Sequence, residues 1–170
     1  PWWQLANPVS EDISRRLSES CSIGVLAREQ LILVARAEGP RTLNINLSPG
    51  RVVPVNTVGI GRVLLAEMGD KELSYFFERN PPVALTPYTI TCVSEIKEAL
   101  IQVKKQGYAI VNQELEIDLM AIAVPIRDNE GIAVAAIGIS TKMHRHTYEQ
   151  LVKYVLPILR EGAERIEKLI

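Results

Sequence analysis

The sequence is poor in the residues that metal sites, disulfide frameworks and membrane spans require. It has two cysteines, Cys21 and Cys92, in 170 residues, and only 5% of the residues are aromatic. The cysteines lie far apart with no His or Cys at ligand spacing, which argues against a zinc site and a disulfide framework and favours a reducing, cytoplasmic compartment. No apolar run approaches the roughly 20 residues that a bilayer requires. We therefore expect a soluble chain without a metal or other cofactor.

Charge of one sign is also missing. The 19 basic and 20 acidic residues nearly cancel, and the only adjacent lysines are Lys104 and Lys105. Because duplex binding needs a clustered cationic face, this chain alone is not expected to bind nucleic acid. What the sequence does have is apolar residues, 47% of the total, which suffice for one sizeable core in one domain, residues 1–170.

The polar candidates for catalysis occupy loop-like segments. His144 and His146, the only two histidines, precede the last predicted helix, and no serine lies in a G-x-S-x-G elbow. Glu114, Glu116 and Asp118 are spaced two apart, so they do not share a helix face and predict a solvated turn. Nothing here demands an enzyme.

Periodicity and caps define the predicted elements. Helices are expected at about residues 7–20, with Asn7 as N-cap and Pro8 as first residue, and at 57–68, 70–79, 94–106 and from Thr147 onward, with a kink at Pro157. Strands are expected at Ser22–Ala27, Leu31–Glu38, Thr42–Leu47, Tyr108–Asn112, Met120–Arg127 and Ile132–Ser140.

The last two predicted strands are apolar on both faces, so they belong at the centre of the sheet. The order of elements predicts an α+β domain with a six-stranded antiparallel sheet and helices packed on it.

The segment VNTVGIGRVLLA at residues 55–66 is the strongest candidate for a binding site. Gly59 and Gly61 open an apolar helix, whose first N–H groups have no internal partners and suit a small carboxylate. Thr57 would donate a hydroxyl hydrogen. Possible countercharges are Arg36, Arg41 and Arg62. The alternative is that the two glycines only permit close packing of the helix on the sheet.

Apolar residues on the predicted strands would supply the walls of such a site, and small residues in the hairpin would leave room for a flat ring. The candidate wall residues are Leu43, Ile45, Val53, Leu119, Ala121, Ile137 and Ile139. The small residues are Ala121, Ala123, Ala135, Ala136 and Gly138.

Four segments of the chain resemble the effector-binding domain of IclR-type bacterial transcription regulators. They are SCSIGVLAREQLILVAR at 20–36, RVVPVNTVGIGRVLLA at 51–66, LTPYTIT at 85–91 and QGYAIVNQELEIDLMAIAVPIRD at 106–128. The resemblance implies a GAF-like fold, a homodimer or tetramer, and an N-terminal winged helix-turn-helix that binds operator DNA and is absent here. Residues 1–20 would be the linker and dimerisation helix.

The resemblance also implies a set of pocket residues. They are Thr42, Ile45, Val53, Gly59, Ile60, Val111, Leu119, Ala121, Gly138 and Ser140. Relatives that bind small oxoacids have Asp, Cys and Ser where this chain has Val111, Ala121 and Gly138, so a small oxoacid would lose hydrogen bonds here. The chemical arguments above add five further residues to the predicted site: Arg41, Leu43, Thr57, Gly61 and Ile137.

The segment RAEGPRTLNINLSPG at 36–50 further resembles the branch of the family that responds to 4-hydroxybenzoate and protocatechuate. Met120 and Asp118 replace the Arg and Gly usual in that branch. The resemblance predicts a sensor of a small aromatic carboxylate that controls aromatic catabolic genes as an activator. Two alternatives remain: a small enzyme acting on an aromatic acid with an Arg or Tyr108 as acid, and a dimerisation module without a ligand.

Overall fold

The strands form one antiparallel sheet in the order β2-β1-β5-β4-β3 in this computed structural model, which describes residues 1–40 and 52–170. Their bounds are β1 (Ser20–Ala27), β2 (Gln30–Ala37), β3 (Ala109–Asn112), β4 (Leu119–Arg127) and β5 (Ala133–Lys142). The α+β class is confirmed, but the described residues contain five strands and not the predicted six. The predicted strand Thr42–Leu47 lies outside them.

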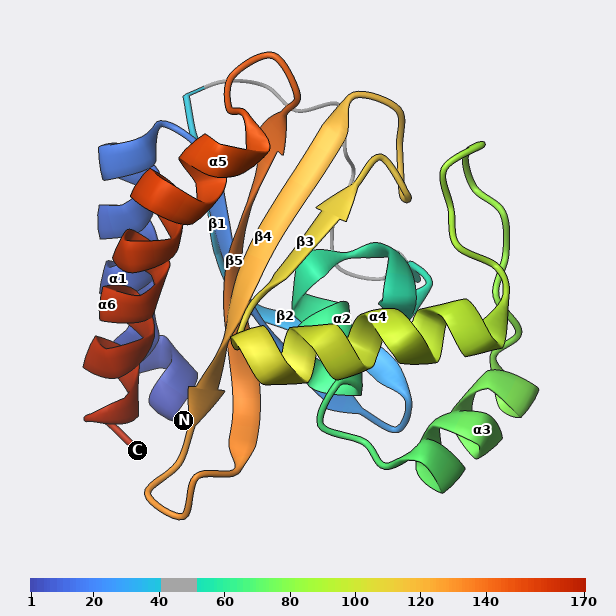
Figure 1. Ribbon diagram of the computed structural model, residues 1–170. Coiled ribbons are helices and arrows are strands. Elements are labelled where there is room, and N and C mark those ends of the chain that lie inside the picture. The colour runs from blue at the N-terminus through green and yellow to red at the C-terminus, as the bar shows by residue number, and fades with distance from the viewer. Residues whose placement is uncertain (41–51) are drawn as a thin grey trace.

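Helices cover both faces of the sheet. They are α1 (Trp2–Leu17), η1 (Val55–Thr57), α2 (Gly59–Leu65), α3 (Asp70–Arg79), α4 (Val93–Gln106), α5 (Tyr148–Gln150), η2 (Leu151–Val155) and α6 (Leu156–Glu167). Figure 1 shows α1 and α6 side by side against one face and α2 with α4 on the other. Of the helices in the described ranges, none has the length and apolarity to cross a membrane.

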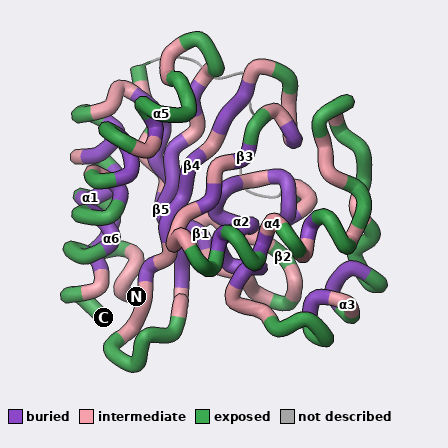
Figure 2. Tube along the Cα trace, in the orientation of Figure 1, coloured by how far each residue is buried: buried purple, intermediate pink, exposed green. Residues whose placement is uncertain are grey.

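The sheet separates two apolar clusters, as the two-sided pattern of its central strands predicts. In β5, Ile137 and Ile139 pack toward α1 and α6, whereas Ala136 packs toward α2 and α4. The central position of the β4–β5 hairpin is confirmed, since β4 pairs with β3 and β5, and β5 pairs with β1 and β4. Figure 2 shows the buried residues concentrated along these strands.

The first helix differs from its prediction at the N-terminal end. It begins at Trp2 rather than after Asn7, so Pro8 lies inside it and not at its first position. The helix extends upstream because Ala6 is fully buried and Trp2 packs against the same core cluster. Tertiary packing thus outweighs the hydrogen bond that an internal proline removes.

The C-terminal helix begins as predicted with a capping box. Thr147 Oγ1 accepts from the Gln150 amide at 3.1 Å, and Gln150 Oε1 accepts from the Thr147 amide at 2.8 Å. The regular helix is interrupted before Pro157 by the π-helical turn η2, in which the Leu156 amide donates to the Leu151 carbonyl, and Pro157 lies in the first turn of α6. A π-turn is one of the recognised ways in which a helix changes direction.

Candidate functional site

A cavity of about 540 Å³ lies between the sheet and the N-terminal end of α2. This volume falls within the range of sites that take small organic ligands. Ten of the residues predicted for the site and its walls line it: Val53, Thr57, Gly59, Ile60, Val111, Leu119, Ala121, Gly138, Ile139 and Ser140. Predicted residues Arg41, Thr42, Leu43 and Ile45 lie outside the described part of the chain.

Ile137 and Gly61 do not line this cavity. Neighbouring residues of a strand point to opposite faces, so Ile137 is buried in the cluster with α1 and α6 while Gly138 faces the cavity. A Cβ at Gly61 would overlap the Val55 carbonyl oxygen. Gly61 therefore allows η1 and α2 to approach each other, whereas the alternative given above, close packing of the helix on the sheet, applies to Gly59.

Gly59 has a different neighbour. A Cβ added there would lie 3.3 Å from the Ala123 Cβ and 3.4 Å from the Ala121 Cβ. At Gly138, an added Cβ would lie 2.7 Å from the Ile122 carbonyl oxygen. The floor of the cavity is thus built from residues with little or no side chain, and any added methyl group would either reduce its volume or collide with β4.

Arg36 supplies the positive charge of the cavity. It lies opposite Ser22 in the β1–β2 pair, and Ser22 lies opposite Gly138 in the β1–β5 pair, so all three share the cavity face. Arg36 Nη1 donates to Ser22 Oγ at 3.1 Å, and the arginine side chain is 21% exposed. No other Lys or Arg is found among the described lining residues.

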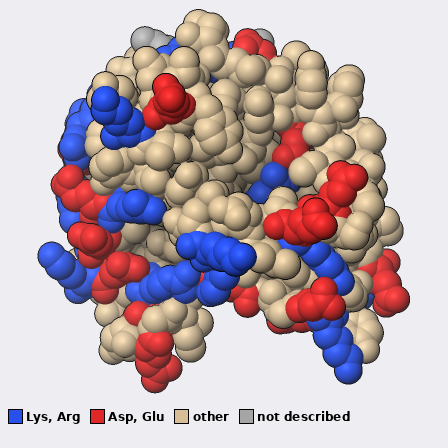
Figure 3. All heavy atoms as spheres, viewed as in Figure 1, with Lys and Arg blue, Asp and Glu red and all other residues tan. Residues whose placement is uncertain are grey.

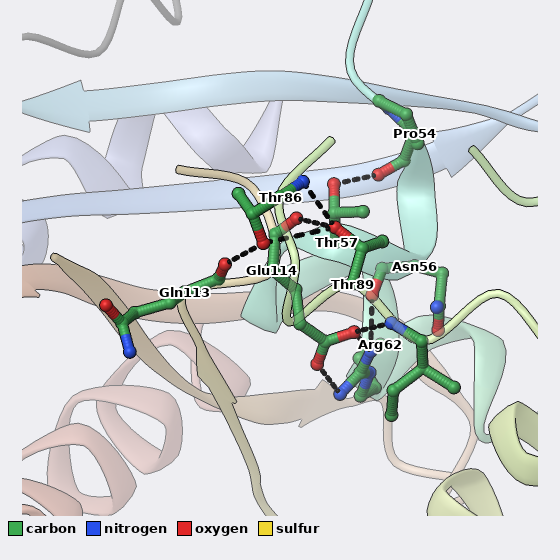
Figure 4. A network of polar contacts seen from close by, with 9 residues as sticks. Pro54, Asn56, Thr57, Arg62, Thr86, Thr89, Gln113 and Glu114 are labelled. Carbon is green, nitrogen blue, oxygen red and sulfur yellow. Dashed lines mark hydrogen bonds and ion pairs between the residues drawn. The ribbon is translucent and has the colours of Figure 1, made fainter. Parts of the chain in front are cut away.

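Arg62 is not available as a countercharge for a ligand. Its Nη1 donates to Glu114 Oε2 at 2.7 Å, and its Nη2 donates to Glu114 Oε1 and to the Asn56 carbonyl, both at 2.8 Å. Both side chains are almost fully buried, 5% and 6% exposed (Figure 4). The predicted solvated turn at Glu114 is therefore wrong: this carboxylate is a buried partner for a charge on an otherwise apolar helix.

The same carboxylate holds a loop in place. The Ile90 amide donates to Glu114 Oε1 at 3.1 Å, while the hydroxyl groups of Thr86 and Thr89 donate to the carbonyls of Gln113 and Glu114 at 2.6 and 2.7 Å. Figure 4 shows these contacts converging on the segment after β3. Three segments far apart in sequence thereby meet at one end of the cavity.

The hydroxyl of Thr57, predicted to donate to a ligand, donates to the protein backbone instead. Its hydroxyl donates to the Pro54 carbonyl at 2.7 Å, and its own amide donates to the same oxygen at 3.0 Å. The hydroxyl hydrogen is therefore already used. At the cavity Thr57 Oγ1 offers an acceptor rather than a donor.

The described residues bring together none of the catalytic candidates. Both histidines lie on the loop after β5, where His144 is exposed and His146 Nε2 is 3.7 Å from Glu19 Oε1. Tyr108 packs against the α1–α6 cluster, on the other side of the sheet from the cavity. Burial raises the pKa of the Cys21 thiol to about 12, so it is not a nucleophile. Within the described ranges, no group of three or more His, Cys, Asp or Glu could hold a metal ion.

A cavity of this size and polarity in an α+β sheet fold defines a small-molecule-binding domain. The family model described as "Bacterial transcriptional regulator IclR C-terminal" matches residues 3–168, and this chain belongs to that family.

Among its relatives, the "Pca regulon regulatory protein" of Pseudomonas putida is 36% identical over 155 residues, which cover 91% of this chain and 53% of the relative. The "p-hydroxybenzoate hydroxylase transcriptional activator" of Acinetobacter baylyi is 32% identical over 88% of this chain and 57% of its own length. The chain thus spans about half the length of these curated relatives.

Solved structures agree with the fold. A transcriptional regulator from Rhodococcus sp. RHA1 superposes with a TM-score of 0.92 at 35% identity, covering 99% of this chain and 68% of that protein. The inducer-binding domain of an Acinetobacter PobR double mutant, in complex with 3-hydroxybenzoic acid, superposes with a TM-score of 0.88 at 29% identity, covering 98% of both chains.

Proposed function

We propose that this domain senses a small aromatic carboxylate, 4-hydroxybenzoate or protocatechuate, for a transcriptional regulator of aromatic catabolism. The observation that carries the proposal is the cavity itself, which combines apolar walls and a small-residue floor with the guanidinium of Arg36 at its β1–β2 side. The names of the relatives, which regulate the Pca regulon and p-hydroxybenzoate hydroxylase, support the same chemical class.

The carboxylate is assigned to Arg36 rather than to the amides of α2. A guanidinium carries a full charge and binds carboxylates in a fork, whereas α2 is only seven residues long. Ser22 and Ser140 line the cavity on the same sheet face and can donate to the second carboxylate oxygen. The ring would then lie over Ala121 and Gly138, against Leu119 and Ile60.

A ring hydroxyl of the proposed ligand needs an acceptor, because burying an unpaired polar group is costly. Thr57 Oγ1, whose hydrogen is donated to Pro54, offers one. The Glu114 carboxylate also lines the cavity, with its charge balanced by Arg62.

Isothermal titration calorimetry tests the assignment with 4-hydroxybenzoate, protocatechuate and glyoxylate. Binding heat is expected for an aromatic acid, and 4-hydroxybenzyl alcohol, which has the ring but no carboxylate, should bind about 10-fold or more weakly because it lacks the charge-assisted bond. Absence of heat with both aromatic acids would contradict the proposal. Product formation during incubation would favour the alternative of an enzyme.

The described residues leave a cavity beside Gly59, where a dimerisation module without a ligand would be expected to place side chains. The remaining parts of the proposal concern the longer protein. We propose that a winged helix-turn-helix precedes this domain and binds operator DNA, and that the regulator is a homodimer or tetramer. The ligand would then shift the balance between arrangements of the subunits by about 1–3 kcal/mol, typical of coupling between sites.

A further inference from the structure

A second cavity, of about 270 Å³, adjoins the proposed effector site. It is enclosed by η1, the C-terminal half of α3, the proline-containing segment 80–83 and the stretch 89–90. Its volume is about half that of the first cavity and several times the roughly 30 Å³ that one water molecule occupies. It has room for a single ring.

The walls of this second cavity are apolar and aromatic. Phe76 and Phe77 are 2% and 5% exposed and meet edge to face, with ring centroids 5.1 Å apart and planes at 88°. Val55 and Ile90 line it as well, and the exposed Val83 lies at its rim. Aromatic rings in this arrangement favour contact with the edge or face of a further ring.

The second cavity offers no positive charge to an anion. None of its described lining residues is Lys or Arg, and Glu29 is its one charged side chain. The hydrogen bond from Arg79 Nε to Glu29 Oε1, at 2.6 Å, holds the pKa of Glu29 below its usual value, so this carboxylate stays ionised. A carboxylate ligand would find no cation among the described lining residues here, in contrast to the first cavity with Arg36.

Asn56, which lines the second cavity, carries a buried polar atom that lacks a partner. Asn56 is 6% exposed and lines the cavity. Its backbone carbonyl accepts from Arg62 Nη2, but its side-chain oxygen Oδ1 has no hydrogen bond in the described structure. A buried acceptor left unpaired is energetically costly, so a molecule that brings an N–H or O–H donor to this atom gains affinity.

We propose that this cavity is a second ligand site, which takes a small uncharged aromatic molecule with one hydroxyl or amino donor directed at Asn56 Oδ1. The edge of the ring would pack on Phe76 and Phe77, and Pro82 and Val83 would cover it. The site does not depend on the identity of the effector in the first cavity.

The two cavities are adjacent. Gln30, Val52, Val53 and Thr57 line both of them. If the proposed effector function holds, a ligand in one cavity therefore changes the shape of the other, and binding at the two sites is coupled. By linkage, the change in affinity is the same in both directions.

Phenol and toluene are the probes, since they differ only in a hydroxyl that replaces a methyl group. Methyl-selective NMR of the chain reads out the location, because Val55, Val83 and Ile90 line only the second cavity whereas Ile60, Val111 and Leu119 line only the first. Phenol is expected to shift the methyl signals of Val55, Val83 and Ile90 in the second cavity. It should bind about 3- to 10-fold more tightly than toluene, which is the contribution of one neutral hydrogen bond. 4-Hydroxybenzoate is expected to bind in the first cavity, so any shift that it causes in the signals of Val55, Val83 and Ile90 should be smaller than the shift caused by phenol.

Two variants and a control complete the experiment. Asn56→Leu removes the unpaired acceptor at nearly constant volume, so it should abolish the preference for phenol over toluene without lowering the unfolding midpoint. Val83→Trp, at an exposed rim position, should block both probes. Ile132→Trp makes a similar change at an exposed residue on the β4–β5 loop, away from both cavities, and should leave binding unchanged.

The proposal is overturned if phenol shifts only the methyl groups of the first cavity, if it shifts neither set at millimolar concentration, or if Asn56→Leu retains the phenol preference. These results are independent of whether an aromatic acid binds near Arg36. Failure of the effector assignment and failure of this one are therefore distinguishable.

Discussion

The glycines at the start of α2 pack against different neighbours, and the free energy of unfolding of glycine variants measures how tightly each one is packed. A side chain at Gly61 would overlap the Val55 carbonyl, whereas a Cβ at Gly69 meets nothing within 4 Å. Gly61→Ser should lower the free energy of unfolding by at least about 1–3 kcal/mol through overpacking. Gly69→Ser is the control, since Gly69 is the N-cap of α3, a position that favours serine. Equal unfolding midpoints in urea would show that η1 and α2 can move apart freely.

Arg36 is the residue on which effector binding depends in the proposed function. Arg36→Met should weaken 4-hydroxybenzoate binding about 10- to 100-fold, the usual contribution of a hydrogen bond to a charged group. Arg15→Met changes an arginine on α1 whose side chain is 71% exposed, and should have no effect. Calorimetric titration compares the two variants. An unchanged dissociation constant for Arg36→Met would place the carboxylate elsewhere.

At the scale of single residues, part of the site follows from the sequence. The period of two in a strand already implies that Ile137 and Gly138 cannot both face one cavity. Arg62 is the only charged residue within the apolar segment 58–66, which signals that a buried acid must lie nearby. The identity of that acid could not be predicted, because Glu114 lies 52 positions away and is adjacent to Arg62 only in the fold.

Among the elements, the Arg62–Glu114 pair joins α2 to the segment after β3. Arg62→Met leaves Glu114 buried without its counter-ion, which should cost about 3–5 kcal/mol of unfolding free energy. The double variant Arg62→Met/Glu114→Leu should be more stable than Arg62→Met, since no uncompensated charge remains. Chemical denaturation measures both. A double variant no more stable than the single one would refute this account.

Arg165→Met serves as the surface comparison for that pair. Arg165 Nη1 contacts Asp12 Oδ2 at 2.9 Å, but the two side chains are 43% and 31% exposed. Its loss should cost about 1 kcal/mol or less.

A second set of charges joins α4 and β4 through Glu67. Its burial raises the pKa, but hydrogen bonds from Arg127 and Lys104 outweigh this effect and hold the pKa below the ordinary 4.5. A lowered pKa stabilises the fold above the unfolded pKa, and this contribution is lost as the pH falls through the folded value. Glu67→Gln should therefore destabilise at pH 7 by about 1 kcal/mol or less, with a deficit that narrows below pH 4.5.

Thermal unfolding at several pH values measures this deficit. Glu11→Gln, at an exposed position of α1, is the control and should show no such narrowing. A deficit that grows on acidification would have the wrong sign for a carboxylate with a lowered pKa.

Element types were predictable where the pattern was long, as in β4, β5 and α4. Boundaries failed where tertiary contacts decide them: Trp2 and Ala6 pack into the core and extend α1 past its proline. The helix predicted after Thr57 begins at Gly59, and a separate 3-10 turn, η1, precedes it, with Val58 in an extended conformation between them. Local helix propensity does not predict the extended conformation of Val58, because it takes no account of the close approach of Gly61 to the Val55 carbonyl.

For the whole molecule, the proposed effector should act as a stabiliser. A ligand that binds only the native state at 100 times its dissociation constant adds about 2.7 kcal/mol. For a domain of this length that corresponds to a rise of about 5–10 °C in unfolding temperature. Scanning calorimetry with and without 4-hydroxybenzoate measures the shift, with 4-hydroxybenzyl alcohol as the control. No rise at saturating acid would contradict the proposal.

Charges on the face viewed in Figure 3 are of both signs and interspersed, in keeping with the near-zero net charge of the sequence. The arrangement of the sheet, by contrast, rests on pairings such as β1 with β5, which bring residues about 115 positions apart side by side, as in Ser22 opposite Gly138. The topology of such long-range pairs is not encoded in any local window.

The two sides of β5 can change independently over evolution. Substitutions at Ser140 would alter what the chamber accepts, while Ile137 continues to secure the helices behind the sheet. Gly138 is the exception, because an added Cβ would lie 2.7 Å from the Ile122 carbonyl oxygen. Paralogues could thus diverge toward new ligands through Ser140 without endangering their folding. A selection experiment that randomises only Ser140 should accordingly recover many folded members with altered ligand preferences.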